Sequence, residues 1–209
     1  DLQGKQAVVI GAGEVAARKV KGLIEAGAVV KLVSPEIHPE LQNLQGKNLS
    51  IVQREYRTGD LEGAFLAVAS TDDPLVNRKV REEASQKKII LNVIDKPDLC
   101  DFTFSSRVQQ GEFLLTISTG GASPALAKKV REELENQFGP EYGTLTAILF
   151  ALRVPIKKEK GKEADGLFAE FVRSPILNWI RERDEKKIDQ LMSRLFGEKY
   201  SLEQIGIKL

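Results

Sequence analysis

Short, nearly continuous apolar runs alternate with helix-like segments through the first half of the chain. Consecutive apolar residues are typical of strands buried on both faces, which occur where helices cover both sides of a parallel sheet. Four runs have this character: Gln6–Ile10, Val29–Val33, Phe65–Ala69 and Lys88–Val93. A weaker strand at Ser50–Gln53 and helical patterns at Glu14–Ala26 and Pro74–Gln86 fall between them. The alternation therefore predicts an α/β fold in which helices cover a parallel sheet.

The pattern changes after the fourth run. We expect two late strands, Phe102–Ser105 and Glu112–Ser118, joined through "RVQQGE", and then a helix over Pro124–Gln137. Beyond this helix only helical patterns remain. "EYGTLTAILFALR" has apolar residues at helical spacing, and the charged "KKEKGKEADG" is typical of an exposed connector. A last amphipathic helix is expected to start at Ser174-Pro175 and to end at Gly197 as its C-cap.

Charge and composition limit the kinds of partner. The 209 residues include 31 Lys and Arg against 30 Asp and Glu, so no strong overall field attracts nucleic acid. No apolar run approaches the ~20 residues of a membrane span, and the first residues do not resemble a secretion signal. The single cysteine, Cys100, excludes an internal disulfide and suits a reducing compartment. We therefore expect a soluble cytoplasmic protein that binds neither nucleic acid nor membrane.

The segment "VVIGAGEVAARK" places a glycine loop between the first strand and the first helix. Its residues 11–16 fit G-x-G-x-x-[G/A] in the strand–loop–helix setting that gives the pattern its meaning. Gly11 permits the tight turn, Gly13 lets the backbone approach a pyrophosphate, and Ala16 allows close helix–strand packing. We predict a Rossmann-type dinucleotide site in which Gly11, Gly13, Glu14 and Val15 contact the cofactor. An ordinary glycine turn is the alternative.

Polar residues follow the second and third apolar runs, where a cofactor in such a sheet binds. The second run ends in Ser34-Pro35-Glu36, so the acid that usually holds a ribose hydroxyl comes late, and Ser34 or Glu36 takes that role. No arginine stands there to pair with a 2′-phosphate, which favours NAD over NADP. After the third run, Thr71 and Asp72 are expected to line the cofactor cleft, while Asp72 or Asp73 also suits the cap of the next helix.

The stretch "STGGASPALAKKVREELE", residues 118–135, is a second glycine loop that opens a helix. Ser123 is a good N-cap, and Pro124 suits the first helical position. The charges that follow run against the helix dipole, because the cations come first and the acids later. We predict an anion-binding site for a substrate here, formed by Gly120, Gly121, Ser123, Lys128, Lys129 and Arg131. A solvated surface face is the alternative.

One carboxylate lies between the two loops at the end of a predicted buried strand. Asp95 follows the run that ends at Val93, so we expect it at the edge of the sheet that faces the cleft, where it can act as a general base. A turn-forming aspartate before Lys96-Pro97 is the alternative. The only histidine, His38, is expected on the surface. The sequence therefore offers neither a histidine-based triad nor a Cys/His metal site.

Four motifs taken together resemble one known family. "GAGEVAARKV", "ASTDDPLVN", "NVIDKP" and "STGGASPALAKKVREELE", in this order and spacing, look like the siroheme-synthase dehydrogenases. The resemblance covers residues 2 to about 140, and the second glycine loop is its most distinctive part. It implies oxidation of precorrin-2 to sirohydrochlorin with NAD. Some members of the family also insert iron, with Fe2+ as a substrate.

The resemblance also implies an organisation for the whole chain. Residues 1–111 would form the NAD-binding Rossmann domain, residues 112–143 a dimerisation region with the tetrapyrrole-binding loop, and residues 144–209 a helical domain. The tetrapyrrole carries eight carboxylates, which would explain a second anion-binding loop. Asp95 matches an aspartate to which the family assigns roles in dehydrogenation and in metal insertion, and which some dehydrogenase-only relatives lack. The late strands imply a homodimer.

Two other interpretations stay open from the sequence alone. The chain could be an NAD-binding regulatory module whose C-terminal helices bind a partner protein. It could also be a chelatase in which NAD is only structural. Asp95 and the Ser123 loop argue against a regulatory module, because a sensor needs neither of them. Production of NADH separates a dehydrogenase from a chelatase.

Overall fold

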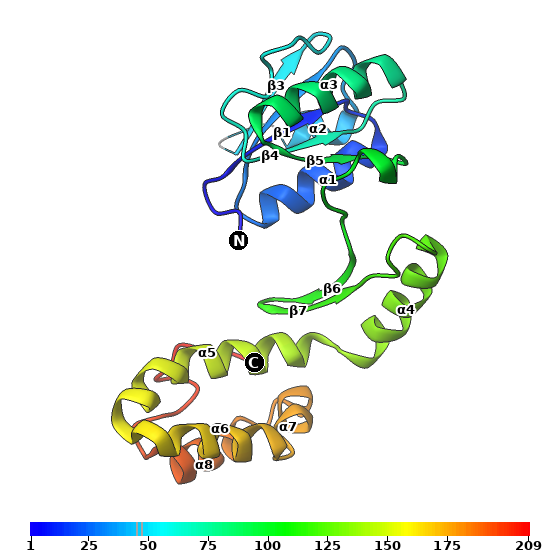
Figure 1. Cartoon of the computed structure of the whole chain (residues 1–209). Helices are drawn as coiled ribbons and strands as arrows, with labels where there is room; N and C mark the ends of the chain where they lie inside the picture. The colour runs from blue at the N-terminus through cyan, green and yellow to red at the C-terminus, as the bar shows by residue number, and fades with distance from the viewer. Residues whose placement is uncertain (45, 47) are drawn as a thin grey trace. The chain divides into compact units, whose positions relative to one another are not determined.

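The computed structural model describes residues 1–44, 46 and 48–209. The chain forms two compact units, Asp1–Phe104 and Ser105–Leu209, drawn in Figure 1. We call them the N-terminal and C-terminal units. The three-part division predicted from the sequence stays a prediction, and its boundary at residue 111 falls in the turn of a hairpin of the C-terminal unit.

The N-terminal unit contains the predicted parallel sheet. Its five strands lie in the order β3-β2-β1-β4-β5, and every neighbouring pair is parallel. The chain first builds outward from β1 to β3 and then crosses to the other side of β1, so the direction of winding reverses between β1 and β4. The strands are β1 (Gln6–Ile10), β2 (Val29–Ser34), β3 (Leu49–Gln53), β4 (Leu66–Ala69) and β5 (Ile90–Val93). The α/β prediction is confirmed, including the weaker strand.

Alternate residues of each strand face opposite sides of the sheet, and helices bury both sides. Ala7 and Val9 of β1 belong to a core with α1 (Glu14–Glu25), whereas Val8 and Ile10 belong to a core with α3 (Pro74–Lys87). All four side chains are at most 2% exposed. This two-sided burial explains why the strands are apolar at most positions. A short helix, α2 (Pro39–Asn43), precedes β3.

A buried acid holds the connection between β3 and β4, which contains no helix. Asp60 is 4% exposed and accepts hydrogen bonds from both Nη atoms of Arg54 at 2.7 Å. It also accepts from Lys31 Nζ at 3.2 Å and from the backbone N–H of Arg57 at 2.8 Å. The bonds from Arg54, with those from Arg57 and Lys31, hold the pKa of Asp60 well below its usual range. The acid is therefore ionised in the folded state and anchors the loop.

One late strand is displaced from its predicted position. Residues Phe102–Ser105 are irregular rather than a strand, because Phe102 and Phe104 pack on the core of α1, with their rings 5.3 Å apart. The first strand is instead β6 (Ser106–Gln110), within the predicted connector, and it pairs antiparallel with β7 (Phe113–Ile117). A two-residue turn at Gly111-Glu112 joins them, and Gly111 has a φ of +56°. Glycine adopts this left-handed conformation more easily than other residues, which explains why a glycine stands in the turn.

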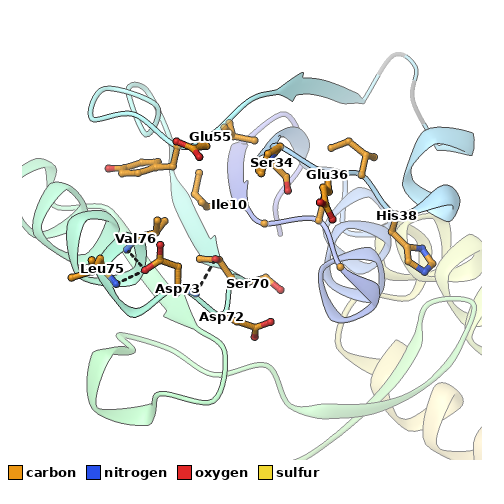
Figure 2. Close-up of a pocket in the computed structure, with 18 of the residues that line it drawn as sticks. Ile10, Ser34, Glu36, His38, Glu55, Ser70, Asp72, Asp73, Leu75 and Val76 are labelled. Atoms are coloured by element: carbon orange, nitrogen blue, oxygen red, sulfur yellow. Dashed lines mark hydrogen bonds between the residues drawn. The ribbon is translucent and has the colours of Figure 1, made fainter.

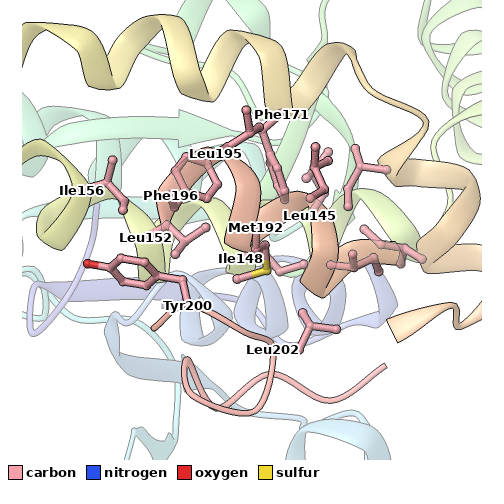
Figure 3. Packing of buried hydrophobic residues seen from close by; sticks show 14 of the residues in the cluster. Leu145, Ile148, Leu152, Ile156, Phe171, Met192, Leu195, Phe196, Tyr200 and Leu202 are labelled. Atoms are coloured by element: carbon pink, nitrogen blue, oxygen red, sulfur yellow. The ribbon is translucent and has the colours of Figure 1, made fainter. Parts of the chain in front are cut away.

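Four helices of the C-terminal unit, α5 to α8, enclose one apolar cluster. From α5 (Pro140–Lys160), Leu145, Ile148, Leu152 and Ile156 lie at helical spacing and face the cluster, as Figure 3 shows. The other helices are α4 (Pro124–Gln137), α6 (Ala164–Arg173), α7 (Ile176–Glu182) and α8 (Glu185–Phe196). The predicted helix α4 and the C-cap Gly197 are confirmed. In the described part of the chain, no helix is long and apolar enough to cross a bilayer.

Two predictions for this region are wrong. The charged segment 157–166 is exposed as predicted, apart from Ala164, but it is not a connector, because α5 continues to Lys160 and a single 3-10 turn leads directly into α6. The last helix is two helices, because Arg183 adopts a left-handed conformation with a φ of +54° that ends α7. Asp184 then caps α8 by accepting a hydrogen bond from the backbone N–H of Lys187 at 3.1 Å.

The Asp60 cluster gives a stability prediction. Asp60→Asn should lower the free energy of unfolding at pH 7 by about 1.5–3 kcal/mol, because charge-assisted hydrogen bonds to a buried acid are lost. The pKa of Asp60 is lowered by folding, so its contribution is complete above the usual range of an aspartate and declines as the pH falls below that range. Urea unfolding at pH 7 and pH 3 checks both points. A difference between wild type and variant that is equally large at pH 3 would contradict the assignment.

Candidate nucleotide-binding cleft

A cleft of about 700 Å³ opens at the carboxyl ends of β1, β2 and β4. Figure 2 shows residues from the ends of these strands converging on it. This is the point where the winding of the sheet reverses, and ligands of open α/β sheets bind at such switch points. The lining residues are Ile10–Gly13, Val33–His38, Glu55, Tyr56, Ser70–Asp73, Leu75, Val76 and Lys79.

Gly11 is required by two features of the backbone. Its φ is +93°, a left-handed conformation that side chains rarely adopt. A Cβ atom on Gly11 would lie 2.2 Å from the carbonyl oxygen of Ser70, at the end of β4. The backbone N–H of Gly11 also donates to Val33 O at 2.9 Å. The predicted tight turn is therefore observed, and it brings the loop against the ends of both neighbouring strands.

Gly13 has a different reason for lacking a side chain. Its φ of −78° is open to any residue, and a Cβ atom there would meet no protein atom within 4 Å. Gly13 is also the N-cap of α1, and no side chain accepts a hydrogen bond at this cap. The first turn of α1 thus directs backbone N–H groups at open space beside the cleft, an arrangement that binds phosphate groups. The residues present fit a dinucleotide.

The other predicted cofactor residues divide into two groups. Ser34, Pro35, Glu36, Thr71 and Asp72 all line the cleft, Ser34 being largely buried. The side chains of Glu14 and Val15 do not line it, although their backbone N–H groups belong to the first turn of α1. Glu14 instead lies 3.9 Å from Arg18 on the surface of the helix. Contacts of all these residues with a cofactor stay a prediction.

Of the two aspartates that follow β4, one caps a helix and the other stays free to face the cleft. Asp73 Oδ1 accepts hydrogen bonds from the backbone N–H groups of Leu75 at 2.7 Å and Val76 at 3.4 Å. Asp72 is exposed at the cleft and is not the N-cap of α3. The sequence left the choice of cap open, and the structure assigns it to Asp73.

Several lining residues were not found from the sequence. Tyr56 forms part of the wall, and its hydroxyl donates to the buried carboxylate of Glu83. Burial and this hydrogen bond raise the pKa of Tyr56, so the phenol stays protonated. His38, expected simply on the surface, lines the cleft and also caps α2 by accepting from Glu40 N at 3.4 Å. Lys79 of α3 lines the cleft as well. These residues lie in loops or on a polar helix face, where no motif marks them.

Asp95 lies beyond the end of β5, as predicted, but its side chain does not line the cleft. It is exposed and has a φ of +58°, a conformation that aspartate tolerates better than most residues. The thiol of Cys100 fastens this turn, because Sγ lies 3.1 Å from Val93 O and 3.3 Å from Lys96 O. Asp95 therefore forms a turn, as the alternative interpretation held. Its catalytic role stays a prediction.

The second glycine loop lies in the C-terminal unit. Gly120 and Gly121 have φ values of +62° and +85°, so both need to be glycine, and a Cβ atom on either would meet no protein atom within 4 Å. Ser123 Oγ accepts a hydrogen bond from Leu126 N at 3.2 Å, which confirms it as the N-cap of α4. The hydroxyl of Thr119 ties the loop to both the N–H and the carbonyl of Ser123.

The cations of α4 have partners on their own helix. Lys128 lies 3.9 Å from Glu132, and Lys129 lies 3.8 Å from Glu133. Arg131 pairs with Glu135. These pairs account for part of the unusual charge order, but exposed pairs of this kind contribute little, and the order with the cation first is the weaker one. The ammonium groups remain exposed to solvent and available to an anion. Among the described residues, no group of three or more His, Cys, Asp or Glu side chains gathers as a metal site.

A parallel sheet with an uncapped glycine loop at its switch point defines the class of dinucleotide-binding Rossmann-type domains. Residues 1–106 match the family described as "Putative NAD(P)-binding", and residues 115–137 match that described as "Sirohaem biosynthesis protein central". The chain belongs to the siroheme-synthase dehydrogenase family, as its motifs predicted.

Known relatives of the chain agree with this assignment. A siroheme synthase of Azotobacter vinelandii is 31% identical over 195 residues, which cover 92% of this chain and 42% of that protein. A siroheme synthase of Methylobacillus flagellatus is 39% identical over 158 residues, which cover 75% of this chain and 34% of that protein. The chain thus spans less than half the length of these relatives. The solved structure of SirC, precorrin-2 dehydrogenase, has a TM-score of 0.77 at 27% identity and covers 96% of this chain and 97% of its own.

The empty space at Gly13 leads to a prediction that separates binding from folding. Gly13→Asp should leave the thermal midpoint unchanged or slightly higher, because an aspartate is a good N-cap and its Cβ meets no protein atom. The same change should weaken NAD binding about 100-fold or more, because it puts negative charge where phosphates bind. Calorimetric titration and thermal melts measure the two effects. Gly166→Asp, on α6, is the charge-matched control, and unchanged NAD affinity in Gly13→Asp would refute the placement.

Proposed function

We propose that the chain oxidises precorrin-2 to sirohydrochlorin with NAD as the cofactor, a step of siroheme biosynthesis. The observation that carries this proposal is the uncapped first turn of α1 at the switch point, beside a cleft of about 700 Å³. The relatives named siroheme synthase and precorrin-2 dehydrogenase support the choice of reaction. A regulatory module without chemistry is less well supported, because it would need no second glycine loop.

The residues of the cleft, and Asp95 outside its lining, have distinct roles in this proposal. The N–H groups after Gly13 hold the pyrophosphate, and Ser34 or Glu36 holds the ribose hydroxyls at the tip of β2. When bound, NAD+ supplies the acceptor for a hydride. The oxidation also releases a proton, and the exposed carboxylate of Asp95 accepts it. Asp95 follows β5, which lies on the far side of β1 from the ribose-binding tip of β2.

The second glycine loop is proposed to bind the substrate. Gly120 and Gly121 leave open space above the start of α4, and Lys128 and Lys129 present exposed positive charge on the helix. Arg131, which is half-buried and paired with Glu135, adds a third cation one turn further along. Precorrin-2 is a tetrapyrrole with carboxylate side chains, so several separated cations suit it better than one deep anion pocket. Ser123 supports this loop by capping the helix.

Iron insertion is a second candidate activity of the same chain, with Fe2+ as a substrate. The observation that favours it is the presence of Asp95, an exposed carboxylate that is fixed in position by its left-handed turn and by Cys100. An exposed carboxylate can both accept protons from the ring and receive a hydrated metal ion. Absorbance of the product with and without Fe2+, after NADH production is complete, separates insertion from oxidation.

A second copy of the chain is the proposed partner. Helix α4 has 14 residues and buries none of them within one chain, and Leu126 is 51% exposed. The hairpin β6–β7 is a sheet of only two strands, and Leu114 on β7 is also 51% exposed. Within one chain the hairpin packs against α4 and α5 through its other face, where the ring of Phe113 lies 5.1 Å from that of Tyr142, so Leu114 and Leu126 stay open to solvent. A two-fold dimer would cover both.

The catalytic role of Asp95 is tested by a change that keeps its turn. Asp95→Asn preserves a residue that tolerates the left-handed conformation but removes the proton acceptor. The value of kcat for NADH production should fall about 100-fold or more, while NAD affinity is retained. Asp98→Asn, a nearby exposed aspartate on the 3-10 turn, is the matched control. If Asp95→Asn turns over saturating precorrin-2 at the wild-type rate, Asp95 only forms the turn.

The proposed dimer is tested by charging its apolar surface. Light scattering at micromolar concentration should give twice the mass of the chain for wild type. Leu126→Asp should give the mass of one chain, because the new carboxylate would be buried without a partner. A wild-type protein of single-chain mass, or a variant that stays dimeric, would exclude α4 as the interface.

A further inference from the structure

Two carboxylates at the cleft lie at equivalent positions just beyond the ends of neighbouring strands. Ser34 at the end of β2 is in register with Gln53 at the end of β3, and Gln53 Nε2 donates to Pro35 O at 3.2 Å. Glu36 and Glu55 each lie two residues beyond this pair, and both line the cleft. Parallel strands are ~4.8 Å apart, so the two acids follow neighbouring strand ends at the same edge of the sheet. Figure 2 shows Ser34 and Glu55 on this side of the cleft.

The cations nearest to these acids are turned away from the cleft. Arg54 precedes Glu55 in the chain, but both of its Nη atoms are bound to Asp60 at 2.7 Å. Lys31 Nζ is bound to the carbonyl oxygen of Asp60 at 2.9 Å. Neither side chain lines the cleft. Of the lysines and arginines in the described residues, Lys79 lines it, and Lys79 belongs to α3, which follows β4 on the other side of β1.

We propose that Glu55 is a specificity-determining residue that rejects a 2′-phosphate on the adenosine ribose of the cofactor. The inference rests on the proposed function, because it assumes that a nicotinamide dinucleotide binds in this cleft. A ribose with a free 2′-hydroxyl needs one hydrogen-bond acceptor, which Ser34 or Glu36 supplies. Glu55 then adds a negative charge beside the ribose that is not required for hydrogen bonding to the 2′-hydroxyl. A 2′-phosphate would meet two carboxylates and no available arginine, and like charges brought together weaken binding strongly.

Binding of the two cofactors to the full chain tests this inference without any catalytic assay. The ratio of the Kd for NADP+ to the Kd for NAD+ is measured by calorimetric titration for wild type and Glu55→Gln. Glu55 is exposed, so the substitution does not disturb the core. We expect the ratio to fall about 10-fold in Glu55→Gln. Glu82→Gln, an exposed glutamate of α3 that does not line the cleft, removes the same charge and should keep the wild-type ratio.

Salt provides a second measurement on the same proteins. Exposed charges are screened by added salt, so the wild-type ratio should decrease between 50 mM and 500 mM NaCl, and it should decrease less in Glu55→Gln. An unchanged ratio in Glu55→Gln would overturn this inference alone. A wild type that prefers NADP+ would overturn this inference together with the choice of NAD in the proposed function. A wild type that binds neither cofactor would overturn the proposed function as well.

Discussion

The N-terminal unit depends on how closely the loop after β1 approaches the end of β4. Gly11 has no Cβ atom, and a Cβ would overlap the carbonyl oxygen of Ser70 at 2.2 Å. The same residue donates to Val33 O on the opposite side, so the loop is held between two strands. Helix α1 begins three residues later, and Ala16 is completely buried where the helix meets the sheet. A side chain at Gly11 would therefore move the helix start, and with it the N–H groups that face the cleft.

The opposite wall of the cleft depends on buried acids rather than on a helix. The connection from β3 to β4 has no crossover helix, and two carboxylates hold it instead. Glu83 of α3 is 2% exposed and accepts from the hydroxyl of Tyr56 and from the backbone N–H groups of Gly59 and Leu61. Asp60, the second carboxylate, binds Lys31 and Arg54. This polar framework fixes the segment that carries Glu55 and Tyr56 into the cleft.

The sequence predicted the strands that are buried on both faces and the helices whose first residues carry a capping motif. Strands buried on both faces are apolar at most positions, and helix starts such as Ser123-Pro124 are marked by caps, so these were found nearly to the residue. The strand Ser106–Gln110 was missed because only Val108 in it is buried, whereas Phe102 and Phe104 have the alternation of a strand but cover α1. The break at Arg183 lies in a charged segment without glycine or proline. The cleft residues Glu55, Tyr56 and His38 depend on strand register and loop contacts, which no local pattern shows.

The two glycine loops differ in what they leave for a ligand. At α1 the N-cap is a glycine without a side-chain acceptor, so the backbone N–H groups of the first turn stay available, as a pyrophosphate requires. At α4 the hydroxyl of Ser123 already satisfies one of these N–H groups, and the positive charge lies on side chains further along the helix. Lys128 and Lys129 are neighbours in the sequence, so their exposed side chains leave the helix in different directions and can meet carboxylates that are spread around a large ring. A compact diphosphate therefore suits the first loop, and a substrate with several separated carboxylates suits the second.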